Sequence, residues 1–204
     1  MHILDQRILG IMILILLGSL VIVKRVTTGS VLDQPKGSLM VQLVNIFNLF
    51  FLLVVNPLAS ILLITSRITA IDPTHMTINS AWGLMLFEIT GLVMYTAGFS
   101  LMAGALITLR NNYQLGGSTP RTEDDLVKEG PYRIVRHPMY TAALSISMGL
   151  AFLIQSWGFF CVFILYFMLI SMLIPMEEYG LKKVYGDPYN VYQQKTKKLI
   201  PFIY

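Results

Sequence analysis

The chain has 204 residues, a formal net charge of +4, 55% hydrophobic residues and only 13% charged residues. Soluble domains are about one quarter charged, so this composition excludes a disordered, a collagen-like and a disulfide-rich chain and indicates an integral membrane protein. The single cysteine, Cys161, excludes an intramolecular disulfide and a cysteine-based zinc site. In so hydrophobic a chain, the basic charge fits anionic lipid head groups better than nucleic acid.

Five apolar segments approach the roughly 20 residues that a membrane-spanning helix needs. They are residues 8–23, 39–65, 81–109, 138–154 and 157–174. Only Gln155 and Ser156 separate the last two segments, which predicts a tight helical hairpin. We therefore expect an all-α integral membrane fold with five transmembrane helices and a C-terminal helical tail. Residues 1–204 form one domain, in which 1–125 hold the first three spans and a loop and 126–204 form the core.

The basic residues are distributed unevenly over the two sides that these spans define. All of the 15 Lys and Arg residues except Arg7 and Arg67 fall on the side that holds the C-terminus. Because cytoplasmic loops carry the excess of Lys and Arg, this distribution predicts that the N-terminus lies outside and the C-terminal tail lies in the cytoplasm.

The tail predicts two short helices after the last span. Pro175 is expected to bend and end that span, so that residues 176–185 form a separate helix stopped by Gly186. In the helix that follows, Tyr189 and Tyr192 are three residues apart and share a face. With lysines on the other faces, we interpret these tail helices as anchors at the membrane surface.

The densest group of polar residues lies at residues 130–140, immediately before and within the start of the fourth span. Pro138 predicts a helix start with His137 at the cap position. A helix N-terminus offers free N–H donors and a partial positive charge, and Arg136 adds a full one, so the segment favours an anionic group. The simpler alternative is a set of interfacial arginines with His137 acting only as a cap.

Two adjacent acids, Glu177 and Glu178, follow Pro175 at the end of the fifth span. Carboxylates at a helix C-terminus oppose the helix dipole, so anchoring alone does not explain them. The predicted hairpin brings them within a helix–helix distance, about 8–10 Å, of the cluster around His137. A zwitterionic ligand would fit between the two helix ends, whereas the simpler alternative is a solvated acidic pair.

Two weaker signals lie inside the spans. Glu88 is an intramembrane acid, which is either functional or close enough to the end of its span to reach water. The second span carries a polar stripe on one third of its circumference, which serves either as contacts between helices or as part of a substrate pocket. Its members are Gln42, Asn45, Asn48 and Asn56.

Several of these residues occur in an order that resembles the isoprenylcysteine carboxyl methyltransferase family, a group of small integral membrane enzymes. The matching residues are Gly130-Pro131-Tyr132, Arg136-His137-Pro138-Met139-Tyr140, Glu177-Glu178 with Leu181, Tyr185-Gly186-Asp187-Pro188-Tyr189 with Tyr192, and Pro201. The resemblance is detailed from Leu126 to Pro201 and only architectural before that, where the short five-span layout is similar to that of prokaryotic members.

The resemblance implies S-adenosylmethionine as the cofactor and no metal. The residues that it places at the cofactor are those of segment 124–127, with Leu126 and Val127 foremost, and Tyr132, His137, Pro138, Met139, Tyr140, Glu177 and Glu178. The chain departs from the family at Asp124, where many members have His, and at Leu173, where many have an Arg that is thought to orient the substrate carboxylate. Arg136, or else Arg133, would then have to take over that orienting role.

The reaction that the family implies is methyl transfer to a lipidic or prenylated acceptor that arrives from the membrane. A carboxylate is already a nucleophile, so no general base is needed and no catalytic residue is assigned. The alternatives are a phospholipid N-methyltransferase, which shares the cofactor site, a sterol-type reductase, which would bind NADPH, and a non-catalytic membrane protein that keeps the fold.

Overall fold

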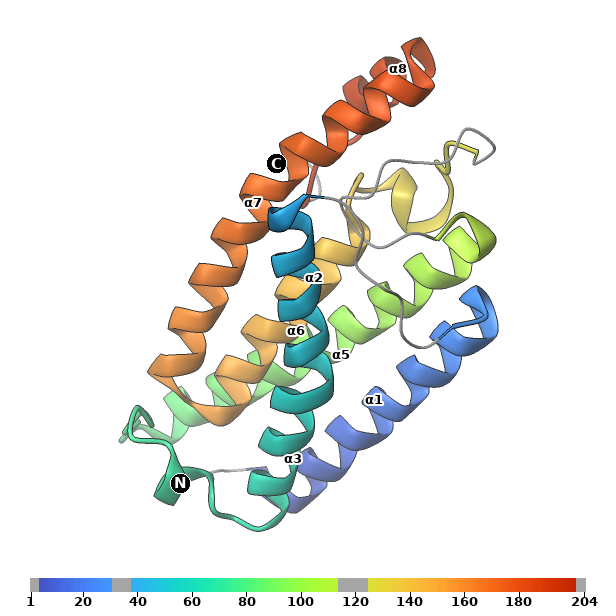
Figure 1. Cartoon of the computed structure of the whole chain (residues 1–204). Coiled ribbons are helices and arrows are strands. Elements are labelled where there is room, and N and C mark those ends of the chain that lie inside the picture. The colour runs from blue at the N-terminus through green and yellow to red at the C-terminus, as the bar shows by residue number, and fades with distance from the viewer. Residues whose placement is uncertain (1–3, 31–37, 114–124, 201–204) are drawn as a thin grey trace.

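The computed structural model describes residues 4–30, 38–113 and 125–200 (Figure 1). Asp124 and Pro201 lie outside these ranges. Within them the fold is helical, and its β-type pairs are two isolated bridges. The elements are α1 (Gln6–Thr28), α2 (Leu39–Phe50), the π-helical turn η1 (Phe51–Val55), α3 (Asn56–Ile64), α4 (Ile68–Ile71), α5 (Ala81–Leu109), the 3-10 turns η2 (Arg110–Asn112) and η3 (Gly130–Arg133), α6 (Pro138–Ile154), α7 (Trp157–Tyr185) and α8 (Asp187–Lys195).

Five long helical segments, called rods below, build the described part of the molecule: α1, the second rod made of α2, η1 and α3, then α5, α6 and α7 (Figure 1). The second rod counts as one because its three elements follow one another without a break. Four of the rods are long and apolar enough to cross a membrane, namely Gln6–Thr28, Leu39–Ile64, Ala81–Leu109 and Trp157–Tyr185. The fifth, α6, has 17 residues, which is about 25 Å of helix against a hydrocarbon core of about 30 Å. The expected all-helical membrane fold is confirmed, and four of the five expected spans reach full length.

The helix ends follow from local sequence. Asp5 caps α1 by accepting a hydrogen bond of 2.8 Å from the backbone N–H of Arg7, and Ser80 and Ser156 accept in the same way from the first turns of α5 and α7. Gly186 ends α7 with φ +58° and ψ −132°, a conformation that residues with a Cβ rarely adopt. These ends fix where each rod turns back.

The expected helix break at Pro175 is wrong. Helix α7 continues through Pro175 to Tyr185, so residues 176–185 belong to the last rod and not to a separate helix. A proline removes one helix hydrogen bond, but contacts on both sides hold α7 in place here. Ile174 is fully buried just before the proline and Glu178 is 6% exposed just after it. The continuous helix carries the acidic pair rigidly to the end of the bundle.

Helices α5 and α6 form the closest pair in the bundle. A Cβ atom built on Gly149 of α6 would lie 2.6 Å from the backbone nitrogen of Tyr95 in α5, and one on Gly91 would lie 2.9 Å from the nitrogen of Leu153. Small residues of this kind let membrane helices approach backbone to backbone. The close contact with α5 therefore holds α6, and with it the N-terminus of α6, in a fixed position.

The intramembrane acid Glu88 is a structural residue. It is 1% exposed, and its carboxylate accepts hydrogen bonds from the backbone N–H of Leu4 at 2.7 Å and from the side-chain amide of Gln155 at 3.2 Å. These bonds join the start of α1, helix α5 and the α6–α7 turn. The sequence allows two interpretations of Glu88, a functional residue or a side chain that reaches water. This buried, hydrogen-bonded environment fits neither of them.

Two members of the polar stripe of the second rod form contacts between helices. Asn56 is fully buried, donates to the carbonyl of Phe51 at 2.8 Å inside the π-helical turn and accepts from the hydroxyl of Tyr95 at 2.7 Å. Asn48 accepts a hydrogen bond from Tyr166 of α7. These two asparagines connect helices, as one of the two sequence interpretations expects.

Candidate active site

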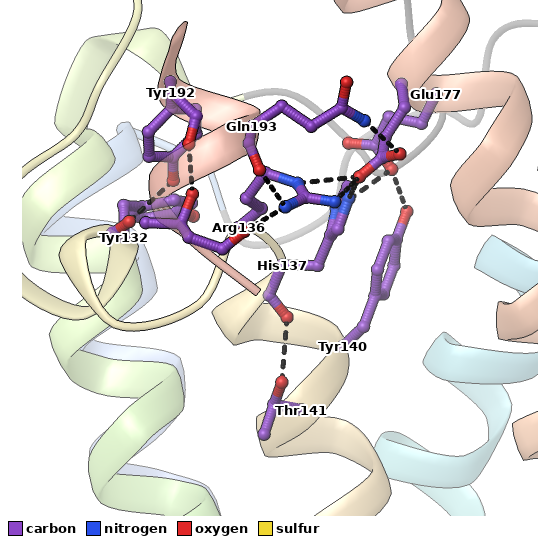
Figure 2. Close-up of polar contacts among 10 residues, drawn as sticks. Tyr132, Arg136, His137, Tyr140, Thr141, Glu177, Tyr192 and Gln193 are labelled. Carbon is purple, nitrogen blue, oxygen red and sulfur yellow. Dashed lines mark hydrogen bonds and ion pairs between the residues drawn. The ribbon is translucent and has the colours of Figure 1, made fainter. Parts of the chain in front are cut away.

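Four segments meet at one end of the bundle, namely η3, the first turn of α6, the last turns of α7 and helix α8 (Figures 1 and 2). Pro138 opens α6 and holds His137 outside the helical region, at φ −121° and ψ 60°. His137 occupies the cap position that the sequence predicts, but its side chain makes no capping hydrogen bond. The ring turns instead towards the acidic pair of α7 (Figure 2).

Glu178 lies in a buried ion pair with Arg136. Its Oε1 is 2.8 Å from both Nε and Nη2 of the guanidinium, and the two side chains are 8% and 6% exposed. His137 Nε2 is 3.3 Å from the same oxygen, and the amide of Gln193 donates to Oε2 at 3.1 Å. This network locks the start of α6 to α7 and α8 (Figure 2).

The guanidinium of Arg136 is also bonded to the main chain of the tail. It donates to the carbonyl of Gln193 at 3.1 Å and to the carbonyl of Thr196. Both donors of Nη1 are therefore directed at the protein rather than at a substrate. A role in orienting an acceptor carboxylate, which the sequence suggests for Arg136, stays a prediction that these bonds do not favour.

Glu177 has a different environment from its neighbour. Its Oε2 accepts a hydrogen bond of 2.7 Å from the hydroxyl of Tyr140 and lies 4.0 Å from Nδ1 of His137. The His137 ring is stacked on the Tyr140 ring, with the ring centres 5.6 Å apart. The Glu177 side chain is 19% exposed, more than twice as much as that of Glu178. The predicted approach of the acidic pair to the start of α6 is confirmed.

Residues 197–199 fold back over the start of α6. The backbone N–H groups of Arg136 and His137 donate to the carbonyls of Lys197 and Lys198 at 2.7 and 3.1 Å, and the hydroxyl of Thr141 donates to the carbonyl of Leu199 at 2.8 Å. These bonds use donors at the N-terminus of α6 that the sequence analysis reserved for an anion. The sequence gives no periodic signal for this pairing.

A cavity of about 340 Å³ opens beside this network. Nine of the ten residues singled out from the sequence line it, namely Leu126, Val127, Tyr132, Arg136, His137, Pro138, Met139, Tyr140 and Glu177. Glu178 is the exception, because its carboxylate is turned into the ion pair with Arg136. Asp125, from the segment that the resemblance assigns to the cofactor, lines the cavity as well. The motif residues Leu181, Tyr185, Tyr189 and Tyr192, which the sequence analysis did not place at the cofactor, also line it, as does Tyr113, which it did not single out.

The same cavity continues into an apolar passage between α1, the second rod and α5. Its wall there consists of Leu20, Val21, Asn45, Ile46, Asn48, Leu49, Phe51, Leu52, Leu53, Met102 and Leu106. Three of these, Ile46, Leu49 and Leu53, are 54%, 42% and 41% exposed on the surface of the bundle. The cavity thus joins a polar end to an apolar part whose lining includes exposed residues of a candidate membrane span.

The interpretation of the tail tyrosines as surface anchors is wrong. Tyr189 is 1% exposed and Tyr192 is 6% exposed, because α8 lies over the end of the bundle. The Tyr192 hydroxyl donates to the carbonyl of Tyr132 at 2.6 Å (Figure 2), and burial raises the pKa of Tyr192 to about 12. Tyr189 is one of the residues that line the cavity, and its buried hydroxyl has no hydrogen-bond partner among the residues that the structure describes.

Leu173, which takes the place of a family arginine, is fully buried. It packs with Tyr140, Tyr166 and Leu199 in an apolar cluster between α2, α6 and α7, and it does not line the cavity. An arginine would not fit this environment without an acidic partner. Any cation that meets an acceptor in this chain must therefore come from another position.

Comparisons with known proteins agree with this arrangement. The family model described as phospholipid methyltransferase matches residues 86–188. Protein-S-isoprenylcysteine O-methyltransferase B of Arabidopsis thaliana is 32% identical over 125 residues, which cover 55% of this chain and 58% of that protein. A probable protein-S-isoprenylcysteine O-methyltransferase of Oryza sativa subsp. indica is 29% identical over 132 residues, covering 55% and 60% of the two chains.

A solved structure shares the fold. The eukaryotic intramembrane Ras methyltransferase ICMT (isoprenylcysteine carboxyl methyltransferase) aligns with a TM-score of 0.54 at 19% identity, covering 80% of this chain and 74% of that one. The present chain spans less than two thirds of the length of the two curated plant relatives.

The fold and the cavity define a helical membrane protein in which a polar chamber at one end of the bundle opens into an apolar passage. The chain belongs to the phospholipid methyltransferase family, whose model covers half of it. The resemblance to isoprenylcysteine carboxyl methyltransferases is confirmed by the curated relatives and by the shared fold.

Proposed function

We propose that the protein transfers a methyl group from S-adenosylmethionine to the carboxylate of a lipidic acceptor, with a prenylated cysteine as the first candidate. The observation that carries this proposal is the single cavity that joins a polar chamber to an apolar passage whose lining includes exposed residues of a candidate membrane span. A water-soluble donor and a lipid acceptor could enter such a cavity from opposite ends. The printed names of the plant relatives support the choice of acceptor.

The residues of the polar chamber suit this donor. Its ammonium and sulfonium groups are cationic, and the chamber presents the carboxylates of Glu177 and Asp125. Tyr189 lies in the same wall, and its buried hydroxyl is without a hydrogen-bond partner among the described residues. The volume of about 340 Å³ lies at the lower end of the range that small-molecule sites have. Leu126, Val127 and Met139 add apolar surface beside these polar groups.

Catalysis in this proposal depends on placement rather than on acid–base chemistry. Bound S-adenosylmethionine supplies a methyl group that is already activated by its positive sulfur. Tyr140 and His137 hold the Glu177 carboxylate in one position, and the Arg136–Glu178 pair fixes the helix that carries His137. Apolar walls exclude water from the acceptor, which removes the hydration of its carboxylate and favours an in-line attack.

The orientation of the protein is part of the proposal. Helix α8 and the end of α7 lie at the same end of the bundle (Figure 1), and both contribute residues to the chamber. This end carries most of the basic residues, so the positive-inside rule supports a cytoplasmic chamber. The donor would then enter from the cytoplasm.

The description of the matching family favours a second candidate, the methylation of an amine phospholipid. Purified protein in detergent, incubated with methyl-labelled S-adenosylmethionine, separates the two candidates. We expect label in a farnesylcysteine analogue and none in phosphatidylethanolamine, with Glu177→Gln as the matched inactive control. Label in phosphatidylethanolamine alone would replace the carboxylate proposal with the amine one. Saturable binding of NADPH without binding of S-adenosylhomocysteine would refute both.

A further inference from the structure

Lys24 lies in the wall of the cavity near the cytoplasmic end of α1. It is partly buried, and Leu20 and Val21, one turn earlier on the same helix, line the apolar passage. Its Nζ atom lies 5.4 Å from the centre of the Tyr113 ring, within the range of a cation–π contact. Lys24 therefore stands where the apolar passage ends.

Tyr113 connects this position with the polar chamber. Burial raises the pKa of Tyr132 well above its usual value of 10, and the nearby Glu177 carboxylate, Tyr192 and Tyr113 add to the increase. Tyr113 and Tyr132 both line the cavity, and the Tyr113 ring contacts Lys24. The junction between apolar passage and chamber is thus formed by Lys24 and Tyr113.

Among the lining residues that the structure describes, Lys24 is the lysine and Arg136 is the arginine. The guanidinium of Arg136 is bonded to Glu178 and to two main-chain carbonyls. A lysine ammonium carries three donors on a flexible stem, so it can keep its contact with an aromatic ring and still bind an anion.

We propose that Lys24 orients the carboxylate of the lipid acceptor at the mouth of the chamber and selects for acidic acceptors. This inference rests on the proposed function and assigns a positioning residue to it. An acceptor whose chain fills the passage beside Leu20 and Val21 would place its polar end next to Lys24. Lys24 would thereby supply the cation that the chain lacks at Leu173.

The charges of the reaction determine which kinetic constant Lys24 affects. A carboxylate oxygen forms a bond to the methyl carbon while the carbon–sulfur bond breaks, and the electron pair of that bond stays on sulfur. The products are a neutral methyl ester and a neutral thioether. Because the negative charge disappears during transfer, Lys24 binds the substrate more strongly than the product. Its loss raises KM for the acceptor more than it lowers kcat, and the neutral ester leaves readily.

The test compares Lys24→Met and Lys24→Arg with Arg25→Met, in full-length protein in detergent. Arg25 is the adjacent residue, is exposed and does not line the cavity, so it controls for the loss of one positive charge. We expect Lys24→Met to raise KM for a farnesylcysteine analogue about tenfold, as the loss of one charge-assisted contact predicts. The kcat should change less than about threefold, and Lys24→Arg should restore most of the affinity.

Two further readouts distinguish this role from a structural one. The affinity of Lys24→Met for S-adenosylhomocysteine should equal that of the wild type, and so should its thermal midpoint. The carboxamide of the same analogue should inhibit both proteins equally, because it carries no negative charge for Lys24 to bind.

The outcomes separate this inference from the proposed function. If the wild type methylates the farnesylcysteine analogue and Lys24→Met has the same KM, the Lys24 assignment is overturned and the proposed function stands. If the wild type methylates phosphatidylethanolamine alone, both are overturned. A KM that rises equally for Lys24→Met and Arg25→Met also overturns the assignment, since general surface charge would then explain the effect.

Discussion

The two adjacent glutamates should respond differently to replacement by glutamine: Glu178→Gln should lower stability, and Glu177→Gln should lower ligand affinity. Glu178 is paired with Arg136, and their side chains are 8% and 6% exposed. Removing one partner of a buried ion pair costs about 3–5 kcal/mol. Because a glutamine keeps one neutral acceptor, we expect Glu178→Gln to lose about 3 kcal/mol. For a chain of this size that loss lowers the thermal midpoint by about 6–12 °C.

Glu177→Gln should behave differently. The Glu177 side chain is 19% exposed and receives a single hydrogen bond from Tyr140, which a glutamine oxygen can also accept. The expected loss of stability is under about 1 kcal/mol, or about 3 °C. Because the Glu177 carboxylate faces the cavity, its neutralisation should weaken S-adenosylhomocysteine binding by about tenfold or more.

Differential scanning fluorimetry and isothermal titration calorimetry on the purified variants measure both quantities. The reasoning requires a large loss of stability only in Glu178→Gln, and a loss of affinity without a comparable loss of stability in Glu177→Gln. The combined Arg136→Met and Glu178→Met protein should be more stable than either single variant, because neither partner is left as a buried charge. Equal stability losses in the two glutamine variants would refute the division of roles.

Three more predictions follow from other contacts. Tyr189→Phe should leave the thermal midpoint unchanged and weaken S-adenosylhomocysteine binding about fivefold, whereas Tyr192→Phe should cost about 1 kcal/mol of stability through its lost hydrogen bond. Unchanged affinity in Tyr189→Phe would remove it from the site. Gly149→Val should prevent close α5–α6 contact and abolish the monodisperse peak in size-exclusion chromatography, while Gly180→Ala, whose added Cβ meets nothing within 4 Å, should not. Glu88→Leu should cost about 2–4 kcal/mol, because it leaves two buried donors without their acceptor, and should not alter ligand affinity.

The sequence was sufficient to predict the helical bundle and the position of its site. Apolar length gave the rods, and Pro138 marked the start of α6 within one residue. The two residues between the last spans predict a hairpin, which brings the acidic pair to the cluster around His137, as the Tyr140–Glu177 hydrogen bond confirms. These features are local or follow from one short turn, so hydrophobic pattern and proline chemistry predict them.

The different roles of Glu177 and Glu178 could not be predicted from the sequence. Adjacent residues on a helix point about 100° apart, so only the rotation of α7 decides which one faces the cavity. The continuity of α7 through Pro175 sets that rotation, and the sequence analysis expected a break there. The pairing of Lys197 and Lys198 with the start of α6 joins segments about 60 residues apart without any repeating pattern.

Lys24 is a similar case. From the sequence it counts only as one of many basic residues that indicate orientation. Its place at the cavity depends on α1 lying against α5, close to Tyr113, which is 89 positions further along the chain. Tertiary contacts between distant segments therefore account for most of what the sequence analysis missed.

The most direct test of carboxylate methylation is to identify the type of chemical bond that holds the transferred methyl group. Membranes from cells that produce the wild type or Glu177→Gln are incubated with methyl-labelled S-adenosylmethionine, and their lipid and protein fractions are then treated with mild alkali. Methyl esters release labelled methanol under these conditions, whereas methylated amines do not. The account predicts volatile label from wild-type membranes and a background level from the variant. Label that stays bound after alkali, at the same level in repeated preparations, would contradict carboxylate methylation.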